Sequence, residues 1–369
     1  PAGTGVAMQT TAVLSRDPAA PFSVETVDLD EPRDNEILVR IVAAGICHTD
    51  LVNRVLGKPD RPVLLGHEGA GVVESVGAAV TSVAPGDHVV LTFRHCGACP
   101  NCAAGRPAYC RNSTALNHFG RRPDRSARVT VAGLPVRDGF FGQSSFAGYA
   151  LATADNTVVV DPAADLAVAA SFGCGFQTGA GAVLNALRPE SGAWLAIYGA
   201  GAVGSAALLA ARTVPGVRTI VVETAAARRK LAQELGADEV LDPAEIDTGA
   251  AIGEITGGGA THALDTTGSP KVLAGAFAAL GTGATVVVVG LGGGVPEIDV
   301  RDLVLSGKTV RGCLEGDAEP STFIPHLLDL HTRGLLPVDR LVTRFPYTEI
   351  ETALAEQHAG SVIKPVLIW

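Results

Sequence analysis

The apolar positions of the chain follow one pattern before about residue 180 and another after it. Short apolar runs separated by turn residues fill the first part, and the clearest candidate strands are residues 36–43, 71–76 and 88–92. From Trp194 onward, short apolar runs alternate with longer alanine-rich or amphipathic stretches. Strands are predicted at residues 194–198, 219–222, 261–265, 285–289 and 309–312, with helices at 203–213 and 225–235. This β-α-β alternation predicts a parallel sheet with helices on both of its faces.

The end of the chain returns to the first pattern. After about residue 325 the predicted elements are short and mixed, and the last candidate strand is 364–369. We therefore predict an α/β protein with three parts. A β-rich domain covers residues 1–180, a doubly wound parallel-sheet domain covers 181–324, and the segment 325–369 rejoins the first domain.

The composition restricts the classes of partner. A chain of 369 residues with 47% hydrophobic and 18% charged residues is not disordered and is long enough for two cores. Its net charge of −10 argues against nucleic acid and anionic membranes, so we expect a small-molecule substrate. Residues 192–211 carry no charge, but their glycines favour a strand, a turn and a helix over a membrane span. Residues 1–11 lack the features of a secretory signal, so we expect a cytoplasmic protein.

A glycine-rich turn follows the first strand of the alternating part. Gly199, Gly201 and Gly204 form a G-x-G-x-x-G motif that opens a predicted helix, the arrangement that cradles the pyrophosphate of a dinucleotide. Glu223 lies nineteen residues after Gly204, at the end of the next strand, where an acid accepts hydrogen bonds from the adenosine ribose. A carboxylate there favours NAD over NADP, whereas Arg228 and its neighbour Arg229 weakly favour the opposite choice.

Cysteines indicate two metal sites rather than disulfides, because the number of cysteines is odd and no secretory signal precedes them. Four cysteines lie in the lobe 94–112 and predict a closed structural zinc site; an iron–sulfur cluster fits their spacing less well. These are Cys96, Cys99, Cys102 and Cys110. Cys47, His67 and Cys174 each lie within two residues of a glycine and leave a zinc ion one open position, although each residue taken singly is more often structural.

These motifs resemble the zinc-dependent medium-chain alcohol dehydrogenases over essentially the whole chain. The resemblance rests on four motifs: the stretch from Gly66 to Val80 with its glycines, the stretch Cys47 to Asp50, the four-cysteine lobe and the turn at Gly199. Four further stretches look most like the benzyl (aryl) alcohol dehydrogenase branch: residues 141–149, 173–181, 265–270 and 307–312. The resemblance implies a GroES-like catalytic domain, a Rossmann NAD-binding domain, two Zn²⁺ ions per chain and NAD as cofactor.

The resemblance also implies residue roles. Cys47, His67 and Cys174 would ligate the catalytic zinc, with Glu68 able to approach it, while Asp50 would hold the other nitrogen of His67. Thr49 would pass on the alcohol proton. The cofactor contacts implied are His48 and Lys364 at the pyrophosphate, Thr178 at the nicotinamide, and Gly199, Gly201, Ala202, Val203, Gly204, Glu223, Arg228, Thr266, Val289 and Leu291 elsewhere along the dinucleotide.

One position departs from the pattern of many relatives. Val52 stands where they carry a histidine that ends the proton relay, so the relay would end in ribose hydroxyls and water, or another residue would substitute for the histidine. Five phenylalanines fall in segments that line or approach the substrate pocket in relatives: Phe93, Phe119, Phe140, Phe141 and Phe146. An apolar pocket would accept benzylic or allylic (terpenoid) alcohols. The main hypothesis is therefore a zinc-dependent dehydrogenase that transfers a hydride between NAD and a primary aromatic or allylic alcohol, with a geraniol-type terpenoid alcohol dehydrogenase as an alternative.

Two other hypotheses remain open. A thiol-dependent formaldehyde dehydrogenase of the same family, using glutathione or mycothiol, would need basic residues, and the run Arg121 to Arg128 is either such an anion site or, more simply, a solvated loop. A non-catalytic nucleotide-binding protein would show a changed zinc ligand, and no ligand position is changed. Family resemblance further implies a homodimer or homotetramer that associates through the nucleotide-binding domain.

Overall fold

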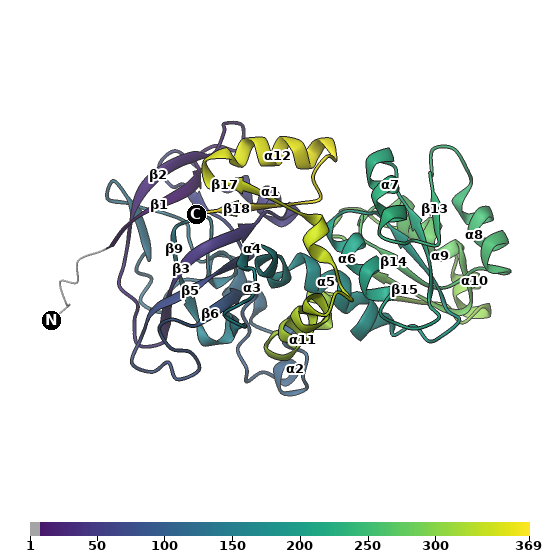
Figure 1. The fold of residues 1–369 in the computed structure, drawn as a ribbon, viewed down its shortest axis with the longest axis horizontal. Coiled ribbons are helices and arrows are strands. Elements are labelled where there is room, and N and C mark those ends of the chain that lie inside the picture. The colour runs from purple at the N-terminus through teal and green to yellow at the C-terminus, as the bar shows by residue number, and fades with distance from the viewer. Residues whose placement is uncertain (1–7) are drawn as a thin grey trace. The chain divides into compact units, whose positions relative to one another are not determined.

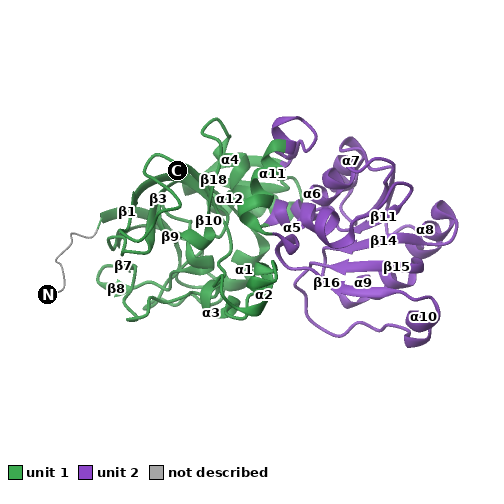
Figure 2. Cartoon of the chain, turned by 90° about the horizontal axis from the view of Figure 1, so that it is seen from below, with its two compact units in different colours: residues 1–174, 319–329, 342–369 green, residues 175–318, 330–341 purple. Residues whose placement is uncertain are grey.

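The computed structural model describes residues 8–369 (Figure 1). Contacts divide the chain into two compact units, coloured in Figure 2. Unit 1 comprises Pro1–Cys174, Glu319–Asp329 and Val342–Trp369, and unit 2 comprises Gly175–Ala318 and Leu330–Leu341. The boundary therefore falls after Cys174 rather than at residue 180, and the short stretch 330–341 belongs to unit 2 rather than to the returning tail.

The sequence around α5 (Gly175–Gly181) explains the shifted boundary. A Cβ atom at Gly179 would overlap the carbonyl oxygen of Val203 on α6 (Ala202–Ala211), so the missing side chain lets the two helices pack closely. Helix α5, whose segment was assigned to the first domain up to residue 180, is thus part of the packing of unit 2.

Unit 1 is built from two sheets. Within the described residues, the five-stranded sheet has the order β4-β1-β2-β7-β8, and the seven-stranded sheet has the order β10-β6-β5-β3-β18-β17, with β9 also paired to β3. The strands are β1 (Met8–Ser15), β2 (Ser23–Leu29), β3 (Glu36–Gly45), β4 (Val63–Leu64), β5 (Gly69–Val76), β6 (His88–Leu91), β7 (Val129–Val131), β8 (Leu134–Pro135), β9 (Tyr149–Thr153), β10 (Thr157–Val159), β17 (Val342–Pro346) and β18 (Lys364–Ile368).

The end of the chain completes the larger sheet. Strand β18, yellow in Figure 1, pairs antiparallel with the purple strand β3, and β17 pairs parallel with β18. This arrangement agrees with the expected return of the tail to the first domain. The helices of this unit are α1 (His48–Arg54), α2 (Pro100–Ala103), α3 (Ser113–Asn117), α4 (Leu166–Ala169) and α12 (Ile350–Ala359), and the start of α11 (Pro320–Thr332) also belongs to it.

The expectation of short elements after residue 325 was wrong in one respect. Helix α11 spans thirteen residues and contains Pro325, which the sequence pattern suggested as a boundary. Ile324 and Leu327 are fully buried, and burial of such side chains offsets the loss of one backbone hydrogen bond at a proline.

Unit 2 confirms the predicted parallel sheet. Among the described residues its six strands follow the order β13-β12-β11-β14-β15-β16 and all pair in parallel. The strands are β11 (Trp194–Tyr198), β12 (Arg218–Val222), β13 (Glu239–Leu241), β14 (Ala260–Asp265), β15 (Leu280–Val288) and β16 (Thr309–Gly312), and the further helices are α7 (Ala226–Glu234), α8 (Thr248–Thr256), α9 (Pro270–Ala278) and α10 (Val300–Leu305). The chain builds the sheet outward from β11, first through β12 and β13 on one side and then through β14, β15 and β16 on the other. Doubly wound sheets bind dinucleotides at the point where the strand order reverses in this way.

The uncharged stretch 192–211 forms β11, a glycine turn and α6, as the sequence predicts. No single helix among residues 8–369 has the length and apolar composition to cross a membrane. One strongly bent pair, Leu166–Gly173 with Gly175–Leu187, meets these two criteria only when its halves are taken together.

Candidate metal and dinucleotide sites

Four potential ligands converge in unit 1. Cys47 is the residue before α1, His67 and Glu68 directly precede β5, and Cys174 follows a short helical turn at residues 170–173. One ligand atom from each of these four residues lies within 4.8 Å of the others. The structure therefore brings together the three predicted zinc ligands and the predicted nearby carboxylate, although up to 127 positions of the chain separate them.

Asp50 orients the imidazole in this group. Its Oδ1 atom lies 3.0 Å from His67 Nδ1 and also accepts the backbone N–H of Gly66, while its Oδ2 atom accepts the N–H of Cys47. Asp50 is the third residue of α1, so one helical turn links Cys47 to the partner of His67. His67 Nε2 is buried and makes no hydrogen bond within the described chain. A buried nitrogen without a partner costs free energy unless a ligand satisfies it, which fits a metal ion.

A buried amide ties the backbones of two ligands together. Gln143 donates from Nε2 to the carbonyls of His67 (2.9 Å) and Thr92 (3.1 Å), and its Oε1 accepts the N–H of Gly69. Thr92 Oγ1 in turn donates to the carbonyl of Gly173, the neighbour of Cys174 (2.7 Å). Gln143 was not predicted to have a role, and its position inside an apolar, aromatic stretch was the available signal.

The electrostatics of the group favour a thiolate at Cys47 and a positive charge at His67. Hydrogen bonding to Cys174 and the neighbouring His67 hold the pKa of the buried Cys47 thiol well below its ordinary value. Burial alone would lower the pKa of His67, but the Asp50 carboxylate and Cys47 outweigh it and raise that pKa. A thiolate is the ligand form of cysteine, and a bound cation replaces the proton of the imidazole.

Lys364, which is predicted to face the pyrophosphate, forms a buried ion pair with Glu68. Its buried ammonium group contacts the Glu68 carboxylate at 2.7 Å and donates to the carbonyl of Ile46 at 3.1 Å. Burial raises the pKa of Glu68, whereas the pKa of Lys364 is raised because Glu68 and Cys47 outweigh its own burial. A pyrophosphate contact through Lys364 would require these bonds to break, so that role stays a prediction.

Helix α1 carries the other predicted polar residues. Thr49 Oγ1 lies 3.8 Å from the sulfur of Cys47. His48 is exposed at the start of the helix. Val52 is 55% exposed, and its aliphatic side chain offers no proton acceptor at the position where many relatives carry histidine.

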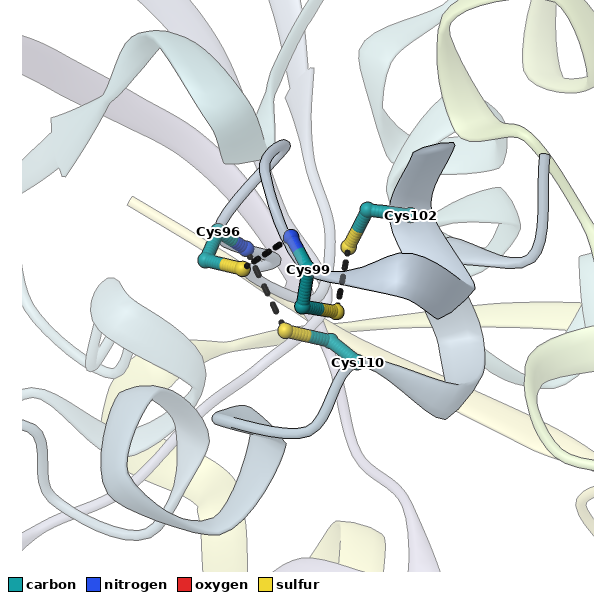
Figure 3. Close-up of side chains that lie close together, drawn as sticks. All are labelled: Cys96, Cys99, Cys102 and Cys110. Carbon is teal, nitrogen blue, oxygen red and sulfur yellow. Dashed lines mark hydrogen bonds between the residues drawn. The ribbon is translucent and has the colours of Figure 1, made fainter. Parts of the chain in front are cut away.

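The second cysteine group forms a compact lobe (Figure 3). The sulfurs of Cys96, Cys99, Cys102 and Cys110 lie within 4.8 Å of one another and point toward a common centre. The backbone N–H of Arg111 donates to Cys99 at 3.4 Å and lowers the pKa of that thiol to about 6. N–H groups aimed at sulfur and four converging donors suit a closed tetrahedral zinc site.

The glycine turn of unit 2 has the geometry that the motif predicts. Gly199 has a φ of 93°, which a side chain would strain, and a Cβ atom at Gly204 would overlap the carbonyl oxygen of Gly199. Gly201 differs, because a Cβ atom there would meet no atom within 4 Å. Internal packing therefore requires Gly199 and Gly204, whereas the missing side chain of Gly201 leaves space beside the start of α6, where Ala202 and Val203 open the helix.

The acid after β12 lies beside this turn. Glu223 Oε2 accepts the N–H of Ala200 at 2.7 Å, and its Oε1 accepts the N–H of Ala225 at 2.8 Å. Arg229 pairs with Asp242 at 2.6 Å, so its charge is already matched. The carboxylate is thus fixed beside the glycine turn, and its recognition of the ribose stays a prediction.

The remaining predicted cofactor residues occupy different surroundings in unit 2. Thr266 donates to the carbonyl of Tyr198 at the end of β11 and so lies at the glycine turn. Val289 directly follows β15, Leu291 is exposed, Thr178 is buried within α5, and Arg228 is partly buried on α7. Thr266 and Val289 follow adjacent strands, which puts them at the same edge of the sheet as Gly199.

Aromatic rings surround His67. The ring of Phe141 lies 4.6 Å from the imidazole and that of Phe140 lies 5.3 Å away, edge-on. Phe93, Phe140 and Phe146 are buried in the interior, so packing is their main role. Phe141 is less buried and has a φ of 50°, a left-handed conformation that bulky side chains rarely adopt. Phe119 shares this conformation, with a φ of 57°, but of the five phenylalanines Phe141 has the ring described closest to the imidazole of His67.

The basic run was expected to be a solvated loop, and for two of its arginines this was wrong. Arg122 is buried and pairs with Glu36 (2.8 Å) and Asp30, and Arg128 pairs with Asp138 (3.2 Å). Glu36 stands eighty-six residues before Arg122, so local sequence gave no sign of the pairing.

Two protein-family models match the chain, one in each of its two parts. The alcohol dehydrogenase GroES-like domain family matches residues 33–162, and the zinc-binding dehydrogenase family matches residues 202–332. Geraniol dehydrogenase from Castellaniella defragrans is 47% identical over 97% of each chain. S-(hydroxymethyl)glutathione dehydrogenase from Candida maltosa is 31% identical over 96% of each. The crystal structure of benzyl alcohol dehydrogenase from Acinetobacter calcoaceticus is 39% identical with a TM-score of 0.93, covering 98% of this chain and 99% of that one.

Proposed function

Because the chain belongs to the zinc-dependent medium-chain alcohol dehydrogenases, we propose that it oxidises primary allylic and aromatic alcohols with NAD and reduces the matching aldehydes. The observation that carries this proposal is the buried group Cys47, His67 and Cys174, with its unpartnered imidazole nitrogen next to the ring of Phe141. The geraniol and benzyl alcohol dehydrogenases among the relatives support the substrate class.

The residues present fit a catalytic zinc ion. Cys47, His67 and Cys174 would hold it, and the four-cysteine lobe would hold a second, structural ion. A bound zinc supplies a Lewis acid that polarises the oxygen of the alcohol or aldehyde. Asp50 keeps the proton of His67 on Nδ1 and so leaves Nε2 free to bind metal. Thr49, beside Cys47, is the hydroxyl placed to accept the alcohol proton, and Val52 leaves its onward transfer to ribose hydroxyls and water.

The glycine turn fits NAD, which supplies the hydride acceptor. The space at Gly201 and the N–H groups at the start of α6 suit a pyrophosphate. Glu223 repels a 2′-phosphate, and the cation of Arg229 is neutralised by Asp242, so NAD is preferred over NADP. In this proposal Thr178 faces the nicotinamide, and His48 faces the pyrophosphate.

The decisive experiment is a substrate panel with the zinc-loaded enzyme. We expect kcat/KM for geraniol, cinnamyl alcohol and benzyl alcohol to exceed that for ethanol by about tenfold or more, because each apolar group that fits a pocket contributes to the transition state. NAD should support higher kcat/KM than NADP. Equal turnover of ethanol would contradict the proposed substrate class, although the family assignment would stand.

A thiol-dependent formaldehyde dehydrogenase is the second candidate. Arg121 and Arg125 make no ion pair within the described residues, so cations are available for a charged thiol, and one relative acts on a glutathione adduct by its name. Formaldehyde turnover that appears only after glutathione or mycothiol is added would establish this activity in place of the first.

A further inference from the structure

A cavity in unit 1 is lined mainly by cationic side chains. Its volume is about 420 Å³, and five arginines line it: Arg61, Arg121, Arg125, Arg128 and Arg137. The backbone fixes two of them side by side, because the N–H of Arg137 donates to the carbonyl of Pro62 at 2.8 Å, next to Arg61. A volume of this size is typical of sites for small molecules.

The cations outnumber the carboxylates that face the cavity. Asp138 is the acidic residue in the lining, and it is engaged by the Arg128 side chain at 3.2 Å and by the backbone N–H of Val129 at 2.9 Å. The neighbouring Asp124 pairs with Arg33 at 2.8 Å, outside the lining. No described carboxylate forms an ion pair with Arg61, Arg121, Arg125 or Arg137.

The side chain of Arg137 lies in an electrostatically unfavourable environment. Its Nε atom is buried and has no hydrogen-bond partner between residues 8 and 369. Burial lowers the pKa of Arg137, and the charges of Arg61 and Arg121 lower it further. Arginine stays protonated in proteins, so the repulsion persists until a negative charge offsets it.

The cavity is separate from the metal group. Phe119 belongs to the lining of the cavity, and its ring stacks on that of Phe140 at 5.1 Å. The guanidinium of Arg137 lies over the Phe119 ring, 5.6 Å from its centroid. Phe140 in turn meets His67 edge-on at 5.3 Å. Two phenyl rings therefore lie between the cationic cavity and the imidazole, and no metal ligand is among the lining residues.

We propose that this cavity binds a small multivalent oxyanion of the phosphate type, such as inorganic phosphate or a phosphate ester. Guanidinium groups bind phosphate oxygens through paired, charge-assisted hydrogen bonds. An anion with about two charges would offset the mutual repulsion of Arg61, Arg121 and Arg137. The proposal is independent of the alcohol substrate, because it concerns a different cavity.

The test is calorimetric titration of inorganic phosphate into zinc-loaded enzyme that carries one equivalent of NADH. NADH fills the dinucleotide site, so phosphate captured there does not contribute, and zinc content is measured before and after. We expect one phosphate per chain in low-salt buffer. Both Arg137→Gln and Arg121→Gln should weaken binding about tenfold or more, because each removes a charged hydrogen-bond donor.

Arg301→Gln is the matched control, since it removes the same charge from an exposed position of α10 in unit 2 and should leave phosphate binding unchanged. Arg121 is exposed, so its variant keeps the test decisive if Arg137→Gln fails to fold. The proposal is overturned if no binding occurs up to about 1 mM phosphate, if all three variants weaken binding equally, or if citrate or glutathione binds this cavity and phosphate does not.

Discussion

At the scale of single residues, Asp50 makes the sharpest prediction about the metal group. Its two oxygens accept from three donors, His67 and Gly66 on one side and Cys47 on the other. An asparagine has a single acceptor oxygen, so Asp50→Asn must lose part of this set. Because such supporting partners orient the ligands, we expect zinc affinity or kcat/KM to fall by about 10–100-fold.

The measurement is zinc retained against a chelator, together with kcat/KM for the preferred alcohol. Asp34→Asn is the matched control, since Asp34 is exposed and accepts the N–H of Ala79 through its backbone carbonyl. Wild-type zinc retention and activity in Asp50→Asn would show that His67 does not depend on this carboxylate.

The proposed substrate class can be tested at Phe141. Its ring lies beside His67, and its backbone adopts the left-handed conformation. If this ring contacts the alcohol, Phe141→Ala should lower kcat/KM for geraniol and benzyl alcohol about tenfold or more while changing ethanol little, since ethanol buries little apolar surface. Phe146→Leu, inside the core, is the comparison for a purely structural loss. An equal loss with all alcohols would remove Phe141 from the substrate pocket.

Residue types with few alternative roles were predictable from sequence. Cysteine and histidine beside glycine, and glycines at fixed spacing, identify donors and turns because few other residues do that chemistry. Gln143 and Glu36 were not predictable, because amides and carboxylates are common on surfaces. Their importance comes from burial and from partners more than seventy residues away.

At the scale of elements, the pair of Glu36 and Arg122 joins the start of β3 to the loop before β7. Arg122 and its hydrogen bonds hold the pKa of Glu36 below its ordinary value, although burial alone would raise it. A lowered pKa means that the pair stabilises the fold above the ordinary glutamate pKa and that this contribution disappears as pH falls through the lowered value. At neutral pH we expect Glu36→Gln to cost about 3 kcal/mol of unfolding free energy.

Urea unfolding of wild type and Glu36→Gln between neutral and acidic pH checks this. The difference between the two proteins should be constant near neutrality and shrink below the ordinary glutamate pKa. Glu74→Gln is the control, since Glu74 faces Arg40 at 3.7 Å on the surface and should change stability by less than about 1 kcal/mol. If the difference in unfolding free energy between wild type and Glu36→Gln grew on acidification, it would contradict a stabilising Glu36–Arg122 pair.

The four-cysteine lobe gives a second prediction at this scale. Cys99→Ser removes one of four converging sulfurs, so zinc content should fall by about one equivalent per chain. Elemental analysis after gel filtration measures the change. Cys313→Ser is the matched control, because Cys313 is buried and belongs to neither converging group. Unchanged zinc in Cys99→Ser would argue that the lobe holds no ion.

Elements were predictable where the pattern repeats. The strands and helices of unit 2 follow the β-α-β alternation, and burial on both faces makes their apolar runs continuous. Helix α11 was missed because Pro325 reads as a boundary in the local sequence, whereas the helix is stabilised by buried tertiary contacts. The position of the boundary at Cys174 likewise depends on helix packing that spacing does not encode.

At the scale of the whole molecule, we propose that the chain forms a homodimer or homotetramer through unit 2. Strand β16 is an edge of the described sheet, and nearby apolar side chains are exposed, among them Leu305 (71%) on α10 and Val310 on β16. An unpaired edge beside apolar surface favours pairing with a second copy.

Leu305→Asp should therefore weaken self-association about tenfold or more in sedimentation velocity, because a buried unpaired carboxylate is costly. Leu335→Asp, a matched change at another exposed leucine of unit 2, should leave the assembly intact. A wild-type chain that sediments as a monomer would refute the proposal.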